Sequence, residues 1–146
     1  MLMNHNLKNL AAGAGIFIFT FAVYLYTIVP SVTGDDSGEL AGACATLGTA
    51  HSPGYPVYCL AGKSAVTMVP WGNKAYRVNI VSAFFLSLTN LVLFVVILKT
   101  SGRLFVSAPA TLLFAFSEPA WGMANVTEVY GVAALVASLI YLAMTR

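Results

Sequence analysis

The sequence predicts an all-α integral membrane protein, and two observations carry that prediction. Hydrophobic residues make up 59% of the 146 positions and charged residues only 8%, whereas about a quarter of an average soluble domain is charged. So few charged side chains cannot cover the surface of a soluble domain of this size. Several uncharged runs also approach the roughly 20 helical residues that cross a membrane. We therefore expect about four transmembrane helices, with short surface or re-entrant helices in the first outer loop.

The predicted spans lie at about residues 10–29, 78–98, 104–117 and 129–144. The first carries Tyr24 and Tyr26 near its end, where interfacial aromatic residues gather, and Pro30 stops it. This run exceeds the apolar core of a signal peptide, so we expect an uncleaved anchor. The third run is short, and Pro109 can kink it. We expect residues 1–146 to form one membrane unit, a fragment of a longer polytopic protein.

The loop between the first two spans, about residues 30–77, contains two short helical segments. Residues 39–49 are rich in alanine, with leucines spaced along one face, which is typical of a surface helix. Residues 51–56 form a rigid turn, because two prolines and a glycine exclude a helix. Residues 57–69 are apolar apart from Lys63 and have the length of buried, re-entrant or interfacial helices. Whether this last segment spans the membrane stays open.

The distribution of charge favours one orientation. Short cytoplasmic loops collect Lys and Arg. If residues 57–69 stay outside, the basic residues 8, 99, 103 and 146 all lie in the cytoplasm and all five acidic residues lie on the opposite face. We therefore favour four spans with both termini inside. The net charge of +2 is dispersed, without a basic run that could follow a phosphate backbone, so we expect no nucleic-acid partner.

Three of the five acidic residues fall within residues 33–39, directly after the first span. One interpretation is a helix start, in which Asp36 or Ser37 caps the surface helix and the acids complement its dipole. Capping needs one polar side chain, however, whereas Asp35, Asp36 and Glu39 place three carboxylates beside a membrane face. The other interpretation is a general base that acts on a lipid-borne substrate. The residues alone leave both open.

Further candidate site residues lie in the same outer regions. His51 and Tyr55 belong to the rigid turn. Lys63 and Arg77 are basic residues on the outer side, where they either reach lipid phosphates as snorkelling side chains or bind an anionic headgroup. Glu128 begins the last span and is either its first-turn acid or a member of the site.

Other chemistries find little support. Asp36-Ser37-Gly38 with His51 is similar to the nucleophile motif of serine hydrolases, but the intramembrane-protease pattern Gly-x-Ser-Gly fails at Asp35. EF-hand spacing and the glycine motifs of nucleotide sites are absent. Cys44 and Cys59 lack metal-ligand spacing, so we expect small buried residues, with a disulfide left open. No metal site and no cofactor is predicted, and a divalent-metal requirement stays open.

Three motifs in one order resemble a known family. They are residues 33–40 (Thr-Gly-Asp-Asp-Ser-Gly-Glu-Leu), 51–56 (His-Ser-Pro-Gly-Tyr-Pro) and 76–79 (Tyr-Arg-Val-Asn); Phe116-Ser117, Trp121 and residues 127–130 extend the likeness. Together they look like the polytopic protein O-mannosyltransferase family typified by transmembrane protein 260. That family is assigned to the GT-C glycosyltransferases. The likeness covers roughly residues 26–130.

The resemblance implies the N-terminal part of a GT-C-type fold. It implies a reaction that moves a sugar, mannose or a similar hexose, from a polyprenyl-phosphate carrier to a hydroxyl of a protein or glycan, on the outward or lumenal face. It implies Asp36 as the catalytic base, accompanied by Glu39. Asp35 and Ser52 depart from the family pattern, so Asp35 stays a second candidate base. We expect a bacterial cytoplasmic membrane, or the endoplasmic reticulum in a eukaryote.

The chemistry of the implied reaction agrees with one essential acid. A phosphate leaving group needs no proton, so displacement requires a base for the acceptor hydroxyl and a cation for the departing phosphate. Lys63 and Arg77 are the candidate cations. Two other classes stay open, a transport or channel module and a non-catalytic membrane subunit. A carrier should place its acids at mid-membrane, whereas these follow a complete span, so we favour the enzyme. Whether this fragment acts alone stays open.

Overall fold

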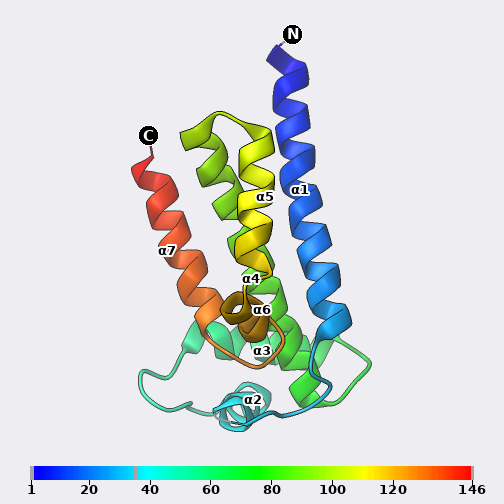
Figure 1. The fold of residues 1–146 in the computed structure, drawn as a ribbon. Coiled ribbons are helices and arrows are strands. Elements are labelled where there is room, and N and C mark those ends of the chain that lie inside the picture. The colour runs from blue at the N-terminus through cyan, green and yellow to red at the C-terminus, as the bar shows by residue number, and fades with distance from the viewer. Residues whose placement is uncertain (1, 35, 146) are drawn as a thin grey trace.

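The computed structural model describes residues 2–34 and 36–145, and this part of the chain contains seven helices and no strand, which confirms the all-α class. In chain order the helices are α1 (Leu2–Thr27), α2 (Ser37–Thr46), α3 (Pro56–Met68), α4 (Lys74–Ser101), α5 (Leu104–Ala115), α6 (Glu118–Ala124) and α7 (Tyr130–Met144). Figure 1 shows α1, α4, α5 and α7 upright and side by side, with α2, α3 and α6 gathered at the end remote from the termini. The long helix α4 contacts every other helix.

Two of the four predicted spans have the length and composition of a membrane helix. They are Leu7–Thr27 within α1, and α4. The apolar helices α5 and α7 hold only 12 and 15 residues, fewer than the roughly 20 that cross a hydrocarbon core of about 30 Å. Four spans therefore stay a prediction. Both termini lie at the same end of the bundle, as an even number of crossings requires (Figure 1).

The two segments of the first outer loop are both helical. The predicted surface helix at 39–49 is α2, which ends at Thr46 because Leu47 adopts the left-handed conformation (φ 56°). The ambiguous segment 57–69 is α3, which lies beside α2 at the end of the bundle instead of standing upright with α4 (Figure 1). The position of this segment relative to a membrane stays a prediction.

The predicted third span, about residues 104–117, is shorter in the structure. Its helix, α5, keeps Pro109 in its interior and ends at Ala115. A separate short helix, α6, then starts at Glu118 with Pro119 in its first turn, where a missing backbone N–H costs nothing. The chain therefore turns at this point and does not continue the helix past Glu118.

Tyr24 is a buried contact between helices, so its prediction as an interfacial residue is wrong. Its side chain is fully buried, whereas Tyr26 is 91% exposed. The Tyr24 hydroxyl donates to the Ala115 carbonyl at 2.8 Å and accepts from Nδ2 of Asn90 at 3.1 Å. It thereby joins α1 to α4 and α5. The uncharged run that begins at Leu10 carries too little polar contrast to reveal which face of the helix is buried.

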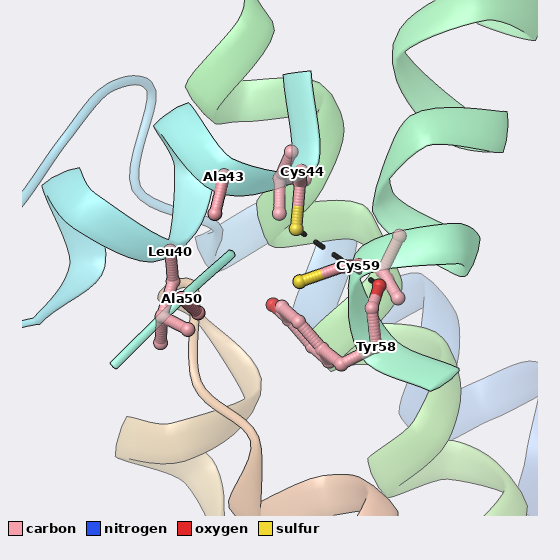
Figure 2. Close-up of a cluster of buried hydrophobic side chains, with 8 residues drawn as sticks. Leu40, Ala43, Cys44, Ala50, Tyr58 and Cys59 are labelled. Carbon is pink, nitrogen blue, oxygen red and sulfur yellow. Dashed lines mark hydrogen bonds between the residues drawn. The ribbon is translucent and has the colours of Figure 1, made fainter. Parts of the chain in front are cut away.

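A buried cluster joins α2 and α3 to α4. Its members are Leu40, Ala43, Cys44, Ala50, Tyr58, Cys59, Val78 and Val81. Figure 2 shows the sulfur atoms of Cys44 and Cys59 directed into the space between α2 and α3. Both cysteines are buried and free, which confirms the expectation of small buried residues. The Cys44 thiol contacts the Tyr58 carbonyl, with 3.9 Å between Sγ and the oxygen.

Gly62 sets how closely α2 and α3 approach. A Cβ atom added there would lie 2.6 Å from Sγ and 2.7 Å from Cβ of Cys44. Gly62→Ala is therefore expected to lower the free energy of unfolding of the intact protein by about 1–3 kcal/mol, because overpacking pushes the two helices apart. Thermal unfolding in detergent measures this loss.

Gly42→Ala is the matched control for this prediction. Gly42 lies within α2, and an added Cβ would meet no atom within 4 Å. Since alanine favours a helix over glycine by about 0.5–1 kcal/mol, Gly42→Ala should stabilise the protein slightly. Equal stability of the two variants would show that the close approach at Gly62 does not constrain the fold.

Candidate functional site

Three side chains that are distant in the sequence meet at the start of α2. Asp36 precedes the helix, Glu39 lies in its first turn, and His51 follows it in the rigid turn. The Glu39 carboxylate accepts from the His51 backbone N–H at 2.6 Å and pairs with its Nδ1 at 2.8 Å. On the other side of the ring, Nε2 lies 3.7 Å from Oδ2 of Asp36. The imidazole therefore lies between two carboxylates.

The Asp36 carboxylate does not cap α2. Asp36 occupies the N-cap position with helical backbone angles (φ −78°, ψ −3°) and makes no capping bond through its side chain. The Ser37 hydroxyl accepts from the Thr33 N–H at 3.1 Å and so closes the preceding turn. The helix-cap interpretation is therefore wrong for Asp36. Its side chain, 64% exposed, is accessible to a substrate. Asp35 lies outside the described residues.

The charges of this cluster reinforce one another. The hydrogen bond to Glu39 raises the pKa of His51, and the negative charges of Glu39, Asp36 and Glu128 act in the same direction. The two bonds from His51 lower the pKa of the Glu39 carboxyl. The pair is therefore favoured as an imidazolium and a carboxylate, which places a positive charge beside Asp36.

These shifts predict how the pair depends on pH. A raised histidine pKa means that its stabilisation is complete below the ordinary value of 6.5 and is lost as pH rises through the raised value. A lowered glutamate pKa means that its stabilisation is complete above 4.5 and is lost as pH falls through the lowered value. The pair is therefore fully formed between about pH 4.5 and 6.5 and weakens on either side.

An NMR titration of the histidine side chains measures this effect. We expect Glu39→Gln to lower the pKa of His51, because the replacement removes the acceptor's charge. The second histidine, His5, is assigned with a His5→Gln variant, whose His51 titration should be unchanged. A His51 pKa that is the same with and without Glu39 would contradict the pairing.

Two further candidates lie close to this cluster. The Tyr55 ring meets the His51 ring edge to face, with 5.3 Å between centroids, and Tyr55 itself adopts a left-handed conformation (φ 44°) directly before α3. The charge of Glu128, which precedes α7, also raises the pKa of His51. The structure thus brings Asp36, Glu39, His51 and Tyr55 together, and the charge of Glu128 acts on this cluster.

Ser82 holds Glu128 in place and was not predicted as a site residue. Its hydroxyl accepts from the Glu128 N–H at 3.1 Å and lies 3.2 Å from the Glu128 carbonyl, to which it donates. The Tyr58 hydroxyl is a third partner at 2.7 Å. A hydroxyl has one donor and two acceptor positions, and these three bonds use them all. The only feature of the sequence that could have indicated this role is that Ser82 is a polar residue inside an apolar span.

Asn79 connects the two loops that carry the acids. It is 1% exposed. Its Nδ2 donates to the Val29 carbonyl at 2.9 Å and the Ser31 carbonyl at 3.3 Å, and its Oδ1 accepts from the Thr127 hydroxyl. The segment that leads to Asp36 and the segment that leads to Glu128 are therefore attached to one side chain of α4.

The structure does not bring Lys63 and Arg77 to the cluster. The Lys63 ammonium donates to the Ala45 carbonyl at 2.8 Å, in the last turn of α2. The Arg77 guanidinium donates to the Val66 carbonyl at 2.9 Å, in the last turn of α3, and to the Trp71 and Gly72 carbonyls at 3.2 and 3.1 Å. Both cations thus stabilise helix C-termini, where carbonyls lack partners.

The same cluster contains the groups that could hold a metal ion. One ligand atom each of Asp36, Glu39 and His51 lies within 4.8 Å of the others. Two carboxylates and an imidazole are ligands that divalent transition metals accept. Both oxygens of Glu39 already bond to His51, so a metal would have to replace that pairing.

An apolar cavity of about 330 Å³ opens beside the cluster. It lies between the turn before α3 and the start of α7 and is lined by Pro53, Tyr55, Pro56, Val57, Tyr58, Val129, Val132 and Ala133. Tyr55 belongs both to this lining and to the ring contact with His51. The charged groups and an apolar surface are therefore adjacent.

Comparisons with known proteins agree on one family. Residues 36–146 match the model of the protein O-mannosyl-transferase TMEM260 N-terminal domain. The chain is 34% identical over 131 residues to the mouse protein O-mannosyl-transferase TMEM260, covering 90% of this chain and 19% of that protein. It is 26% identical over 108 residues to the Dictyostelium discoideum protein of the same description, covering 73% of this chain and 13% of that one. The chain thus spans less than a fifth of these relatives, and no solved structure matches it.

Proposed function

Because the chain belongs to the family of the protein O-mannosyl-transferase TMEM260 N-terminal domain, we propose that it carries the acceptor-activating site of a membrane glycosyltransferase. The substrate is a sugar, mannose or a similar hexose, linked to a polyprenyl phosphate, and the acceptor is a hydroxyl of a protein. The reaction takes place on the non-cytoplasmic face. The observation that carries the proposal is the Asp36 carboxylate, exposed, without a capping role and next to a paired histidine.

In the proposed reaction Asp36 removes the proton of the acceptor hydroxyl. The oxygen attacks the anomeric carbon of the sugar, a new C–O bond forms, and the bond between that carbon and the phosphate oxygen breaks. The polyprenyl phosphate leaves with the electron pair and needs no proton. A positioned general base contributes about 10²- to 10⁴-fold to such a step.

The pair of Glu39 and His51 keeps Asp36 ready for this role. Glu39 holds the imidazole by two bonds, at 2.6 and 2.8 Å, and Nε2 faces Asp36 at 3.7 Å. The pair therefore places a positive imidazole beside the carboxylate that we propose as the base.

One feature of the surroundings supports a lipid-linked donor, and one expected feature is missing. The apolar cavity beside Tyr55 suits the first isoprene units of a polyprenyl chain. The cations Lys63 and Arg77, which we expected to bind the phosphate, are engaged with backbone carbonyls. We therefore assign the cation that assists the departing phosphate to another part of the intact protein.

A comparison of sugar donors tests the proposal. The intact protein, purified in detergent, is incubated with an acceptor protein and labelled mannose that is linked either to polyprenyl phosphate or to a nucleotide diphosphate. We expect transfer from the lipid-linked donor alone, detected as labelled acceptor. Transfer from the nucleotide donor alone, or from neither donor, would overturn the proposed function.

A further inference from the structure

A second charged site lies at the opposite end of the bundle from Asp36, where α1 begins and α4 turns into α5 (Figure 1). A cavity of about 330 Å³ is present there. Its lining consists of Lys8, Asn9, Leu98, Gly102, Arg103, Leu104 and Phe105. Lys8 and Asn9 of α1 and Arg103 of the turn between α4 and α5 thus line the same space as three large apolar side chains.

The backbone around Arg103 is rigidly held. Gly102 closes α4 in the left-handed conformation (φ 66°) and donates to the Leu98 carbonyl at 2.9 Å. The Arg103 N–H donates to the Ser101 hydroxyl at 3.2 Å, and its carbonyl accepts from the Ser107 hydroxyl at 2.8 Å. The next residue starts α5, whose N-terminus adds a partial positive charge. Arg103 is therefore placed by the turn at the edge of this cavity.

The positive charge of the cavity is not neutralised within the described part of the chain. The side chains of Lys8 and Arg103 form no hydrogen bond and no ion pair with any described residue. The described acidic residues lie in or next to α2, α6 and the start of α7, at the other end of the bundle (Figure 1). An anion is therefore the ligand that complements these two cations.

We propose that Lys8 and Arg103 bind the phosphate of an anionic phospholipid, with Asn9 as a hydrogen-bond donor. A free phosphate would be served by the cations alone, whereas this cavity also contains apolar side chains. Phe105 is 74% exposed and Leu10, on the neighbouring α1, is 70% exposed. These two side chains offer an apolar surface to an acyl chain whose headgroup lies in the cavity. The site is independent of the proposed transferase chemistry.

Native mass spectrometry of the intact protein in detergent tests the site, with phosphatidylserine as the probe and phosphatidylcholine as the neutral comparison. We expect selective binding of phosphatidylserine. Lys8→Gln and Arg103→Gln should each weaken it about five-fold, since one basic residue near an anionic lipid contributes about 1 kcal/mol. The affinity of the double variant for phosphatidylserine should be about 25-fold lower. Its melting temperature in the absence of added lipid should be unchanged.

Lys74→Gln is the matched control, because Lys74 is an exposed lysine at the opposite end of α4, and it should leave the binding of phosphatidylserine unchanged. Phe105→Ser should weaken phosphatidylserine binding through the acyl chain, and inorganic phosphate should not displace the lipid. Equal binding to the wild type and the double variant would overturn the proposal. Displacement by inorganic phosphate would overturn the lipid as the ligand and leave a site for a free anion.

Discussion

Asp36→Asn is expected to lower the rate of sugar transfer in the intact protein by about 10²- to 10⁴-fold, the usual contribution of a positioned base. Asparagine keeps the size of the side chain but cannot accept the acceptor's proton at neutral pH. The Asp36 carboxylate makes no capping bond, so the melting temperature should change little. Binding of the polyprenyl-linked donor should also persist, so the loss should appear in kcat and leave KM for the donor nearly unchanged.

Asp35→Asn separates the two neighbouring aspartates. The sequence alone leaves both as candidate bases. The Asp36 carboxylate faces the paired imidazole at 3.7 Å, and Asp35 lies outside the described residues. We expect Asp35→Asn to retain transfer within about ten-fold of the wild type, which is a change of at most about 1.4 kcal/mol in the activation free energy. Wild-type transfer by Asp36→Asn together with a large loss in Asp35→Asn would move the base by one residue.

Asn79→Leu is expected to have the largest effect on stability, a loss of about 3–5 kcal/mol in the free energy of unfolding. The Val29 and Ser31 carbonyls and the Thr127 hydroxyl would lose their partner, and each polar group left unpaired in a buried site costs about 1–3 kcal/mol. Transfer activity should fall as well, because both acid-bearing segments would lose their attachment to α4. Thermal unfolding in detergent and the transfer assay measure the two effects.

Asn90→Leu is the matched control for this variant. Asn90 lies on the same helix and is fully buried, but it makes one bond, to the Tyr24 hydroxyl. Its Oδ1 has no partner among the described residues. Since Tyr24 would keep its bond to Ala115, Asn90→Leu should cost about 1 kcal/mol or less. Equal losses in the two variants would show that Asn79 is no special attachment point.

The sequence predicts much of the helical layout, because uncharged runs and helix breakers are local signals. The first and second spans correspond to α1 and α4, and the turn at residues 51–56 separates α2 from α3. The predicted run 129–144 agrees with α7 within one residue, whereas α5 ends two residues before the predicted end of the third span. The sequence has an apolar run at 104–117, but backbone conformation, not composition, ends α5 at Ala115.

The candidate site is only partly readable from the sequence. Glu39 and His51 lie 12 residues apart, and their contact depends on how the chain turns back after α2. Sequence spacing does not predict that turn. Lys63 and Arg77 were predicted as phosphate ligands only because they are basic and lie on the outer side of the membrane. The sequence does not show that their partners are backbone carbonyls. Ser82 shows the same limit, since its role follows from three bonds to distant groups. The catalytic role of Asp36 stays a prediction.

Asn79 and Ser82 stand three residues apart on α4, which places them on one face with about one helical turn between them. That spacing has a consequence for insertions and deletions. One residue inserted between them would rotate one side chain by about 100° relative to the other, so Asn79 could not stay bonded to Thr127 while Ser82 stays bonded to Glu128. The same insertion between Lys99 and Thr100, beyond both attachment points, would leave their phase intact. The helical phase of one turn of α4 therefore decides whether the segment that carries Glu128 keeps both of its attachments.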